Sequence, residues 1–319
     1  MPLRGFDNHT ITAVVNKRRP FVSRFVNAFP NKVSVATSSV QVDYIDGPEG
    51  LMLAISTNAP SERKTNRNVE TKSYVLPRYS EHDFVTLEEQ TAFRAPGVMN
   101  GGEAFDQLVV SKLDNLRRRI DRTRDFQAIG ALQGQVVDGS GRVIATYPVP
   151  SAVTEDLTNA DINSILDKAS VAISRALGFD VGGLVIHAGV TAYRALLENA
   201  SIREMLKGTQ AGVNLVQTGK LELVGGHVIE RVSGVYKDDE GDDQTWLADN
   251  KVVITSPNMA TQEVFGPMAA QGGRMFIGQF YAEQTEERDP NLTKIRVEAR
   301  PLPLVNRPDG IYQINHVVD

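Results

Sequence analysis

One long amphipathic stretch, residues 102–134, dominates the pattern of hydrophobic and polar positions in this chain. Its apolar side chains recur at spacings of three and four, the signature of one helical face: Phe105, Leu108, Val109, Leu113, Leu116 and Ile120. The stretch holds no proline, and glycines flank it on both sides. The pattern therefore predicts a single helix of roughly 45 Å, far longer than an average globular helix.

The opposite face of this helix is densely charged. It carries Lys112, Asp114, Arg117, Arg118, Arg119, Asp121, Arg122, Arg124 and Asp125. Many of these charges can pair along the helix at spacings of three or four, which predicts a solvated, salt-bridged face. Two alternatives stay open: the surplus of arginine meets carboxylates of another subunit, or it follows nucleic acid. A stripe neutralised by its own aspartates is poorly suited to phosphates.

Residues 1–30 are predicted to form an N-terminal arm. A basic cluster, Lys17 to Arg19, precedes Pro20, and phenylalanines then recur at Phe21, Phe25 and Phe29. This spacing predicts a short amphipathic turn that ends at Pro30. Such an arm offers too little apolar surface to bury itself, so we expect a partner or a neighbouring subunit to hold it.

A long polar excursion interrupts a region of predicted strands. Residues 32–36 and 40–45 read as strands, and residues 74–94 return to strand character. Between them, residues 57–73 hold one aliphatic side chain and six charges: Glu62, Arg63, Lys64, Arg67, Glu70 and Lys72. The pattern predicts a projecting two-stranded loop, which is marginal in water by itself and therefore needs a surface to lie on.

The composition changes after a hairpin predicted at residues 135–146 and the prolines at 148 and 150. A helix is predicted from a cap at Thr158 or Asn159 to Leu177, with Gly178 as its stop. A buried strand at 183–187, helices within 191–207 and strands at 221–224, 228–232 and 251–255 follow. These elements predict a mixed α/β module of ordinary domain size.

The last segment alternates like strands at residues 275–281, 294–298, 301–305 and 311–318, with a turn at 307–310. Strands at the end of a chain need partners from earlier in it. The simplest plan returns them to the sheet under the long helix, which makes the α/β module an insertion. The fold class predicted is therefore α+β.

Composition narrows the classes of function. The chain has 319 residues, 41% of them hydrophobic, and a net charge of −5, so it is folded and is not a general polyanion binder. It has no cysteine, which excludes disulfides, zinc–thiolate sites and thiol catalysis. Because no apolar run approaches 18 residues and no signal-peptide pattern opens the chain, we expect a soluble intracellular protein without membrane contact.

Candidate chemistry is sparse. The glycines of residues 178–189 lack the spacing of a nucleotide-binding turn, and the five histidines match no metal pattern. The acidic run at 238–243 fits a solvated turn better than a calcium loop. We therefore expect no catalytic residue, cofactor or metal. The competing class is a soluble α/β enzyme or ligand-binding protein with a site between its two modules, near Gly182, His187 and Asp249.

An arm, a projecting loop, an overlong helix on a sheet, an inserted module and returning strands together resemble the Hong Kong 97 fold of phage capsid proteins. More specifically, the chain resembles the lambda-type phage major capsid protein E family. The resemblance is carried by PFVSRFVNAFPNKVSVATSSVQVDYIDGPEGLMLAISTNAP, ETKSYVLPRYSEHDFVT, LVVSKLDNLRRRIDRTRDFQAIGALQG, WLADNKVVITSPN and ARPLPLVNRPDGIYQINHVVD. The last of these, with its Pro308–Asp309 turn, is the most persuasive.

The resemblance implies four parts. Residues 1–30 are the N-terminal arm, and residues 31–153 are the first part of the peripheral domain, including the extended loop 57–73 and the spine helix 102–134. Residues 154–273 are the inserted axial domain, and residues 274–319 complete the peripheral domain. The implied contacts between subunits are Arg18, Arg19, Phe21, Phe25, Glu62, Arg63, Lys64, Arg67, Glu70, Lys72, Arg117, Arg118 and Arg122.

The resemblance also implies a function. The chain would be the major capsid protein of a tailed double-stranded DNA phage, a structural protein and not an enzyme. It would form the hexamers and pentamers of an icosahedral head assembled in the host cytoplasm, with decoration, portal and scaffold proteins as partners and DNA held non-specifically inside. An encapsulin-like compartment shell in the same fold stays open, as does a covalent crosslink through Lys64 or Lys72.

Overall fold

The computed structural model describes residues 8–17, 25–45, 69–86, 88–89, 101–206, 221–223, 226–237, 240–288 and 291–317. The chain forms two compact units. Unit 1 comprises Met1–Val40, Tyr74–Ala128 and Gln262–Leu304, and unit 2 comprises Gln41–Ser73, Ile129–Thr261 and Val305–Asp319. The peripheral and axial domains expected from the sequence use other boundaries, and that division stays a prediction.

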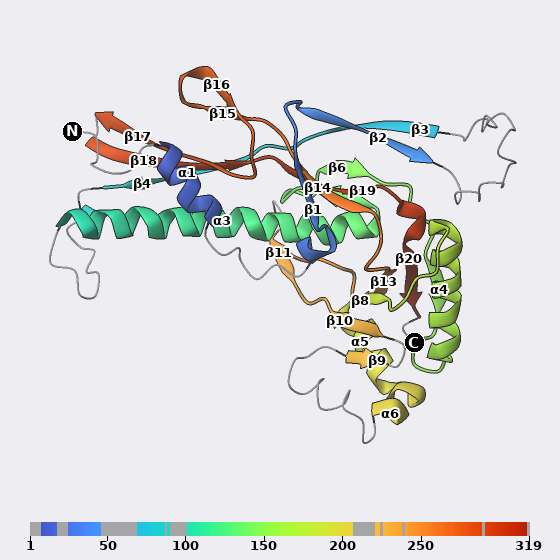
Figure 1. Ribbon diagram of the computed structural model, residues 1–319. Coiled ribbons are helices and arrows are strands. Elements are labelled where there is room, and N and C mark those ends of the chain that lie inside the picture. The colour runs from blue at the N-terminus through green and yellow to red at the C-terminus, as the bar shows by residue number, and fades with distance from the viewer. Residues whose placement is uncertain are drawn as a thin grey trace, which may run out of the picture. The chain divides into compact units, whose positions relative to one another are not determined.

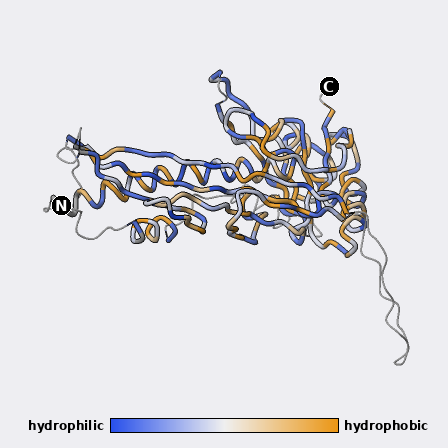
Figure 2. Tube along the Cα trace, turned by 90° about the horizontal axis from the view of Figure 1, so that it is seen from above, coloured by the Kyte–Doolittle hydropathy of each residue, from blue (hydrophilic) through white to orange (hydrophobic). Residues whose placement is uncertain are grey.

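The long helix α3 spans Gly101–Gln133, 33 residues, so its predicted length and position are confirmed. All six side chains of the predicted apolar face are buried. They form one core with residues of the strands β4 (Tyr79–Val85), β17 (Tyr281–Arg288) and β18 (Asn291–Ala299). Figure 1 shows these strands running along the helix, and in Figure 2 hydrophobic and hydrophilic positions alternate around its turns.

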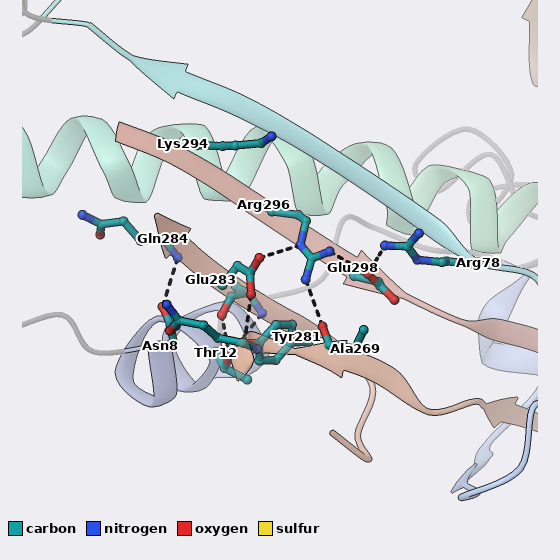
Figure 3. Close-up of polar contacts among 12 residues, drawn as sticks. Asn8, Thr12, Arg78, Ala269, Tyr281, Glu283, Gln284, Lys294, Arg296 and Glu298 are labelled. Atoms are coloured by element: carbon teal, nitrogen blue, oxygen red, sulfur yellow. Dashed lines mark hydrogen bonds and ion pairs between the residues drawn. The ribbon is translucent and has the colours of Figure 1, made fainter. Parts of the chain in front are cut away.

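The sheet over α3 is antiparallel, in the order β17-β18-β4. Ala282 pairs with Val297, and Ile295 pairs with Asp83 of β4. Ala282, Ile295 and Val297 are fully buried. Successive side chains of a strand point to opposite faces, so the residues between them face away from the helix. The charged residues Glu283, Arg296 and Glu298 occupy that second face, which the sticks in Figure 3 show.

The N-terminal arm was expected to need a partner, and for its described residues this expectation is wrong. Residues 8–17 form a helix, α1 (Asn8–Lys17), and the 3-10 turn η1 spans Val26–Ala28. Ile11 and Val15 are buried in the core of unit 1. α1 packs against β17, about 270 residues later in the chain, and so distant a partner is invisible in a sequence pattern.

Several shorter strands complete unit 1. The strands β1 (Asn31–Ser34), β14 (Thr261–Phe265) and β19 (Pro301–Val305) form a sheet in the order β1-β14-β19, in which β1 is parallel to β14. The strands β15 (Met268–Ala270) and β16 (Arg274–Phe276) form a hairpin around the 3-10 turn η2 (Gln271–Gly273).

The base of the predicted projecting loop is a ribbon of β2 (Ser39–Ile45) and β3 (Val69–Val75). The strand predicted at 40–45 is confirmed, and its partner β3 begins at Val69, inside the predicted loop 57–73. Thr71 Oγ1 donates to Asp43 Oδ1 at 2.6 Å across the ribbon. Residues 57–68 of the loop lie outside the described residues.

Unit 2 is built on a six-stranded sheet in the order β7-β20-β13-β8-β10-β9. Its strands are β7 (Val153–Glu155), β8 (Val185–Ala188), β9 (Leu221–Leu223), β10 (His227–Arg231), β13 (Lys251–Thr255) and β20 (Tyr312–His316). The helices α4 (Ile162–Leu177), α5 (Val190–Glu198) and α6 (Ala200–Leu206) share a hydrophobic core with it. The short ribbon of β11 (Val235–Lys237) and β12 (Asp243–Thr245) stands apart from this sheet.

The helix α4 confirms its predicted apolar face and its predicted stop. Gly178 ends it with φ 81°, a left-handed conformation that glycine adopts without strain. The predicted cap is wrong by two or three residues, because Asp161 and neither Thr158 nor Asn159 accepts from the Asn163 backbone N–H. The sequence offers capping side chains at 158, 159 and 161, and only the backbone geometry selects among them.

The turn after α3 also depends on a glycine. Gly134 has φ 94°, and a Cβ there would lie 2.2 Å from Val149 Cγ2. The chain then forms the predicted hairpin from β5 (Gln135–Val137) and β6 (Val143–Thr146).

The final strands β17 to β20 divide among three sheets, which corrects the plan drawn from the sequence. β18 lies on α3 as expected. The strand predicted at 275–281 is wrong in its bounds, because β16 ends at Phe276 and the strand that lies on α3 is β17, Tyr281–Arg288. β20 instead pairs antiparallel with β13 and parallel with β7, and it follows the 3-10 turn η3 (Pro308–Gly310). An alternating pattern identifies a strand but not its partner, so this destination could not be read in advance.

Replacing Leu113 by alanine tests the core of unit 1. The side chain is fully buried against the sheet, so we expect unfolding to become easier by about 2–5 kcal/mol. Urea denaturation followed by circular dichroism measures this. Ser111→Ala, at an exposed position of the same helix, is the matched control and should stay within about 0.5 kcal/mol of the parent. Equal effects of the two changes would contradict the assignment of this face.

Candidate subunit-contact site

A buried ion network occupies the side of α3 that was predicted to be solvated. Arg124 pairs with Glu263 of β14 through two bonds, Nε to Oε1 at 2.7 Å and Nη2 to Oε2 at 2.6 Å. Its Nη1 donates to Asp121 Oδ1 at 2.6 Å. Arg117 Nε lies 3.3 Å from the other oxygen of Asp121. These four residues, called here the α3 ion network, are each at most 7% exposed.

Aromatic rings line the α3 ion network. The guanidinium of Arg117 lies 4.8 Å from the ring centre of Phe280, and that of Arg124 lies 5.2 Å from Phe265 and 5.3 Å from Phe280. Cations over aromatic faces are attracted by the ring quadrupole, more strongly when they are desolvated. The rings therefore shield the two guanidinium groups from water and also attract them.

The same side of α3 fastens the N-terminal segment. Arg117 Nη1 donates to the carbonyl oxygen of Val15 at the end of α1. Asp125 Oδ1 accepts from the backbone N–H of Phe25 at 2.7 Å and from that of Val26 at 3.1 Å. Bonds to charged groups are about twice as strong as neutral ones. The charged face thus holds both described pieces of the arm in place.

The electrostatics of the network balance. Burial alone would lower the pKa of Arg124, but hydrogen bonds and charge from Glu263, together with Asp121, outweigh burial and raise it. Burial lowers the pKa of Arg117, and the nearby Asp121 opposes that effect only in part. Two guanidinium groups and two carboxylates give no net charge, which is the condition under which buried ions are tolerated.

The prediction of a solvated face is therefore wrong for Arg117, Asp121, Arg124 and Asp125. The predicted pairing along the helix is nevertheless present, between Arg117 and Asp121 and between Asp121 and Arg124. Glu263 is the partner that the sequence did not reveal, since it lies 139 residues from Arg124.

Two of the three arginines expected on α3 to contact another subunit lie at the surface. Arg118 and Arg122 are exposed, whereas Arg117 is 7% exposed and leaves little surface for a neighbour. Arg118 borders an open hollow along the helix with Val110 and Asp114.

The remaining expected contact residues fall into two groups. Phe25 is buried within its own unit, while Glu70 and Lys72 lie on β3 with Nζ to Oε1 at 3.3 Å. Outside the described residues lie Arg18, Arg19, Phe21, Glu62, Arg63, Lys64 and Arg67. The contacts assigned to all of these residues stay predictions.

A second polar cluster, called here the sheet-face network, was missed by sequence reasoning (Figure 3). Arg296 Nε lies 3.0 Å from Glu283 Oε1 on the neighbouring strand, and Arg296 Nη1 lies 3.5 Å from Glu298 Oε2. Arg78 Nη2 approaches the same oxygen of Glu298 at 2.8 Å, which raises the pKa of Arg78. Arg296 also donates to the carbonyl oxygen of Ala269 at 2.9 Å.

The sheet-face network also contacts the β15–β16 hairpin, at Ala269 of β15 and at the start of its turn. The hydroxyl of Tyr281 accepts from the Gln271 N–H at 3.1 Å and lies 3.1 Å from Glu283 Oε2. The signal in the sequence was the alternation of charged residues along two strands. This alternation could not identify the ion pairs, because the residues that lie opposite each other on two strands are known only once the register of the strands is known.

His187 and Asp249, two residues named in the competing enzyme hypothesis, make contacts that hold the fold together. His187 is buried in β8, with Nδ1 3.9 Å from Glu230 Oε2, and the Asp249 carbonyl oxygen accepts from the Ala192 N–H at 2.9 Å. In the described part of the chain, no group of three acidic, histidine or cysteine side chains is placed to hold a metal ion. Among the same residues, no helix combines the length and hydropathy needed to cross a membrane.

A family model decides the identity. The model of the family described as phage major capsid protein E matches residues 7–315, nearly the whole chain. The chain belongs to this family. A curated relative, the major capsid protein of Salmonella phage Felix O1, is 23% identical, with 88% of each chain covered. The protein is thus a phage major capsid protein, a structural component of the virion capsid, as the resemblance implied.

Solved structures agree on the fold. A protein assigned as the capsid protein of a prophage in E. coli CFT073 matches with a TM-score of 0.69 at 13% identity, covering 98% of this chain and 99% of that one. A subunit of the mature capsid of bacteriophage PhiM1 matches with a TM-score of 0.53 at 11% identity, covering 94% and 89%. The α+β Hong Kong 97-like fold predicted for this capsid protein is confirmed.

The coupling within the α3 ion network can be measured. Arg124→Met leaves Glu263 buried without its cation and leaves Asp121 only its contact with Arg117, so we expect a loss of about 3–5 kcal/mol in the free energy of unfolding. In the double variant Arg124→Met with Glu263→Met, part of that loss should return, because one uncompensated charge is gone. Urea denaturation checks this, with exposed Arg118→Met as the near-neutral control. Strictly additive losses would argue against the pairing.

A pH dependence is expected from His227. Its Nδ1 accepts from the Leu184 N–H at 3.1 Å, and burial lowers its pKa below the ordinary 6.5. The unfolded chain therefore takes up a proton first as pH falls through 6.5, and stability falls until pH passes the lowered pKa of the folded state. The urea midpoint between pH 8 and 5 should show this fall in the parent and less of it in His227→Asn. Exposed His82→Asn should keep the parent profile, and an unchanged profile in His227→Asn would refute the assignment.

Proposed function

We propose that this capsid protein forms the hexamers and pentamers of an icosahedral head that encloses the double-stranded DNA of a tailed phage. Its work is assembly, without catalytic turnover. Membership of the major capsid protein E family over residues 7–315 is the observation that carries the proposal. The expected axial domain, residues 154–273, packs around the symmetry axes, and the expected peripheral domain joins neighbouring capsomers.

The extended loop is the main contact between subunits in this proposal. Its described base is a two-stranded ribbon, and a ribbon of two strands gains little stability in water unless it lies against something. The loop charges Glu62, Arg63, Lys64 and Arg67 contact a neighbour, and Arg118 and Arg122 of α3 add further contacts. In the arm, whose described residues pack in their own unit, Arg18, Arg19 and Phe21 reach the neighbour.

The shell gains its stability from repetition. Each contact is modest, but closed symmetry makes every subunit engage several neighbours at once, so the assembled contacts exceed any single one. A subunit built around the α3 ion network enters assembly with the buried charges of that network already neutralised. None of the binding free energy is then spent on desolvating those charges.

The proposed partners follow from the role of a head subunit. They are further copies of this chain, decoration, portal and scaffold proteins, and packaged DNA held non-specifically. A net charge of −5 supports weak contact with DNA, because phosphate binding requires a surplus of cations. Assembly takes place in the host cytoplasm.

Particle size tests the proposal directly. Sedimentation and negative-stain microscopy of the purified protein should show closed shells, or rings of five and six subunits. A monomer of 34.9 kDa at every salt and protein concentration would refute it and would favour a ligand-binding protein.

A linker variant tests the role of the loop. Residues 57–68 are replaced by a short Gly-Ser linker that keeps β2 and β3. We expect closed shells to be lost while circular dichroism and the urea midpoint of the subunit stay unchanged. A Gly-Ser insertion of matched length in the exposed β5–β6 turn, after Gly139, is the control and should still assemble. Normal shells from the linker variant would remove the loop from the assembly contacts.

A further inference from the structure

The outer edge of β17 is covered by side chains of a helix. In the described sheet, β17 pairs with β18 on one side only, so backbone groups on its other side need partners from elsewhere. Uncovered strand edges pair readily with other chains, and natural proteins protect them. Here the protection comes from α1, which packs along β17 (Figure 1).

Three polar side chains of α1 take the place of a neighbouring strand, and Figure 3 shows two of them, Asn8 and Thr12. Thr12 Oγ1 donates to the Ala282 carbonyl oxygen at 2.8 Å and accepts from the Ala282 N–H at 3.1 Å. Asn8 Oδ1 accepts from the Gln284 N–H at 3.0 Å. Asn16 Nδ2 donates to the Phe280 carbonyl oxygen at 3.0 Å.

The spacing of these three α1 side chains matches the spacing of the backbone groups along the edge of β17. Four residues of an α-helix rise about 6 Å, and two residues of an antiparallel strand rise about 6.8 Å. Positions 8, 12 and 16 of a helix therefore lie opposite positions 284, 282 and 280 of a strand that runs the other way. The sequence NHTITAVVN places an amide or a hydroxyl at each of these three positions.

Packing alone does not require this stripe. Ile11 and Val15 already hold α1 in the core of unit 1, at 0% and 1% exposure. Asparagine and threonine are weak helix formers, because their side chains compete for backbone hydrogen bonds. Their recurrence at every fourth position satisfies the strand edge and adds little to the helix itself.

We propose that α1 is an edge guard, which keeps β17 from pairing with the same edge of a second copy of this chain. Ala282 presents both its N–H and its carbonyl oxygen at this edge. In an antiparallel pair, two residues of this kind lie opposite each other and exchange two hydrogen bonds. Two copies can therefore meet about a twofold axis at Ala282, with Phe280 of each opposite Gln284 of the other.

This pairing competes with assembly of the shell. It joins two subunits through an edge that the native subunit keeps covered, so it produces irregular oligomers and removes subunits from productive contacts. Further along the strand, Glu286 is exposed and Glu287 is half-buried, and charges on a strand edge disfavour pairing. Of residues 280–284, only Glu283 is charged. This stretch therefore depends on α1 for protection from pairing.

Thr12→Val tests the guard, because valine keeps the shape of threonine and removes the hydroxyl. Thr12→Ser keeps the hydroxyl and is the matched control. The full chain is studied in a buffer where the parent is unassembled, by sedimentation velocity and negative-stain microscopy. We expect Thr12→Val to raise the fraction of irregular oligomers about three- to tenfold, and Thr12→Ser to match the parent.

Hydrogen exchange and a second substitution identify the surface. In the Thr12→Val oligomers, the amide hydrogens of residues 280–284 should stay protected, because a strand of another copy now covers them. Adding Gln284→Pro removes an N–H that points at Asn8 and not at β18, so the β17–β18 pairing is kept while the edge is blocked. This double variant should return to the size of the parent.

The opposite results would overturn the proposal. An unassembled Thr12→Val with fast exchange at residues 280–284 would leave α1 a structural role only. Oligomers that persist with Gln284→Pro would place the contact on another surface. If Thr12→Val is insoluble, Asn8→Ala uncovers only the Gln284 N–H, and it should raise the oligomer fraction by a smaller factor. No rise in that variant would also refute the guard.

Discussion

A buried guanidinium must be neutralised and hydrogen-bonded by its own protein, and this constraint governs unit 1. α3 carries Arg117 and Arg124 on a side that is covered by other segments of the chain. Leaving either without a carboxylate would cost several kcal/mol. Asp121 supplies one carboxylate from α3 itself, and Glu263 supplies the second only while β14 lies against the helix. Electrostatics therefore selects which distant strand may pack there.

Three further segments depend on the same helix. α1 ends where Arg117 reaches the Val15 carbonyl, and η1 begins where Asp125 receives two backbone N–H groups. On the apolar side, Leu113 and its neighbours take the sheet of β17, β18 and β4. A helix with two different faces thus sorts the chain, because apolar strands pack on one side and acidic groups, polar backbone and aromatic rings meet the arginines on the other.

The sequence allowed the elements to be predicted far better than their partners. Periodicity alone located α3, α4 and most strands, because the 3.6-residue repeat of a helix and the two-residue repeat of a strand can be recognised within the segment itself. It missed α1, whose apolar positions Ile11 and Val15 are too few to stand out. It also misplaced β20, and it took the α3 ion network for a solvated surface. Each failure concerns a contact with a distant part of the chain: α1 with Ala282, β20 with β13 and β7, and Arg124 with Glu263. The candidate contact residues were implied by the family resemblance, and burial argues against two of them, Phe25 in the arm and Arg117 on α3.

The packing of α1 on β17 also determines how late in synthesis this helix can reach its native position. Its hydrogen-bond partner Ala282 follows Thr12 by 270 residues. At a synthesis rate of about 5–20 residues per second, roughly 15 to 50 seconds separate the appearance of the two. α1 is therefore synthesised well before β17, the strand on which it packs. Unit 1 can complete its folding only when translation is nearly finished.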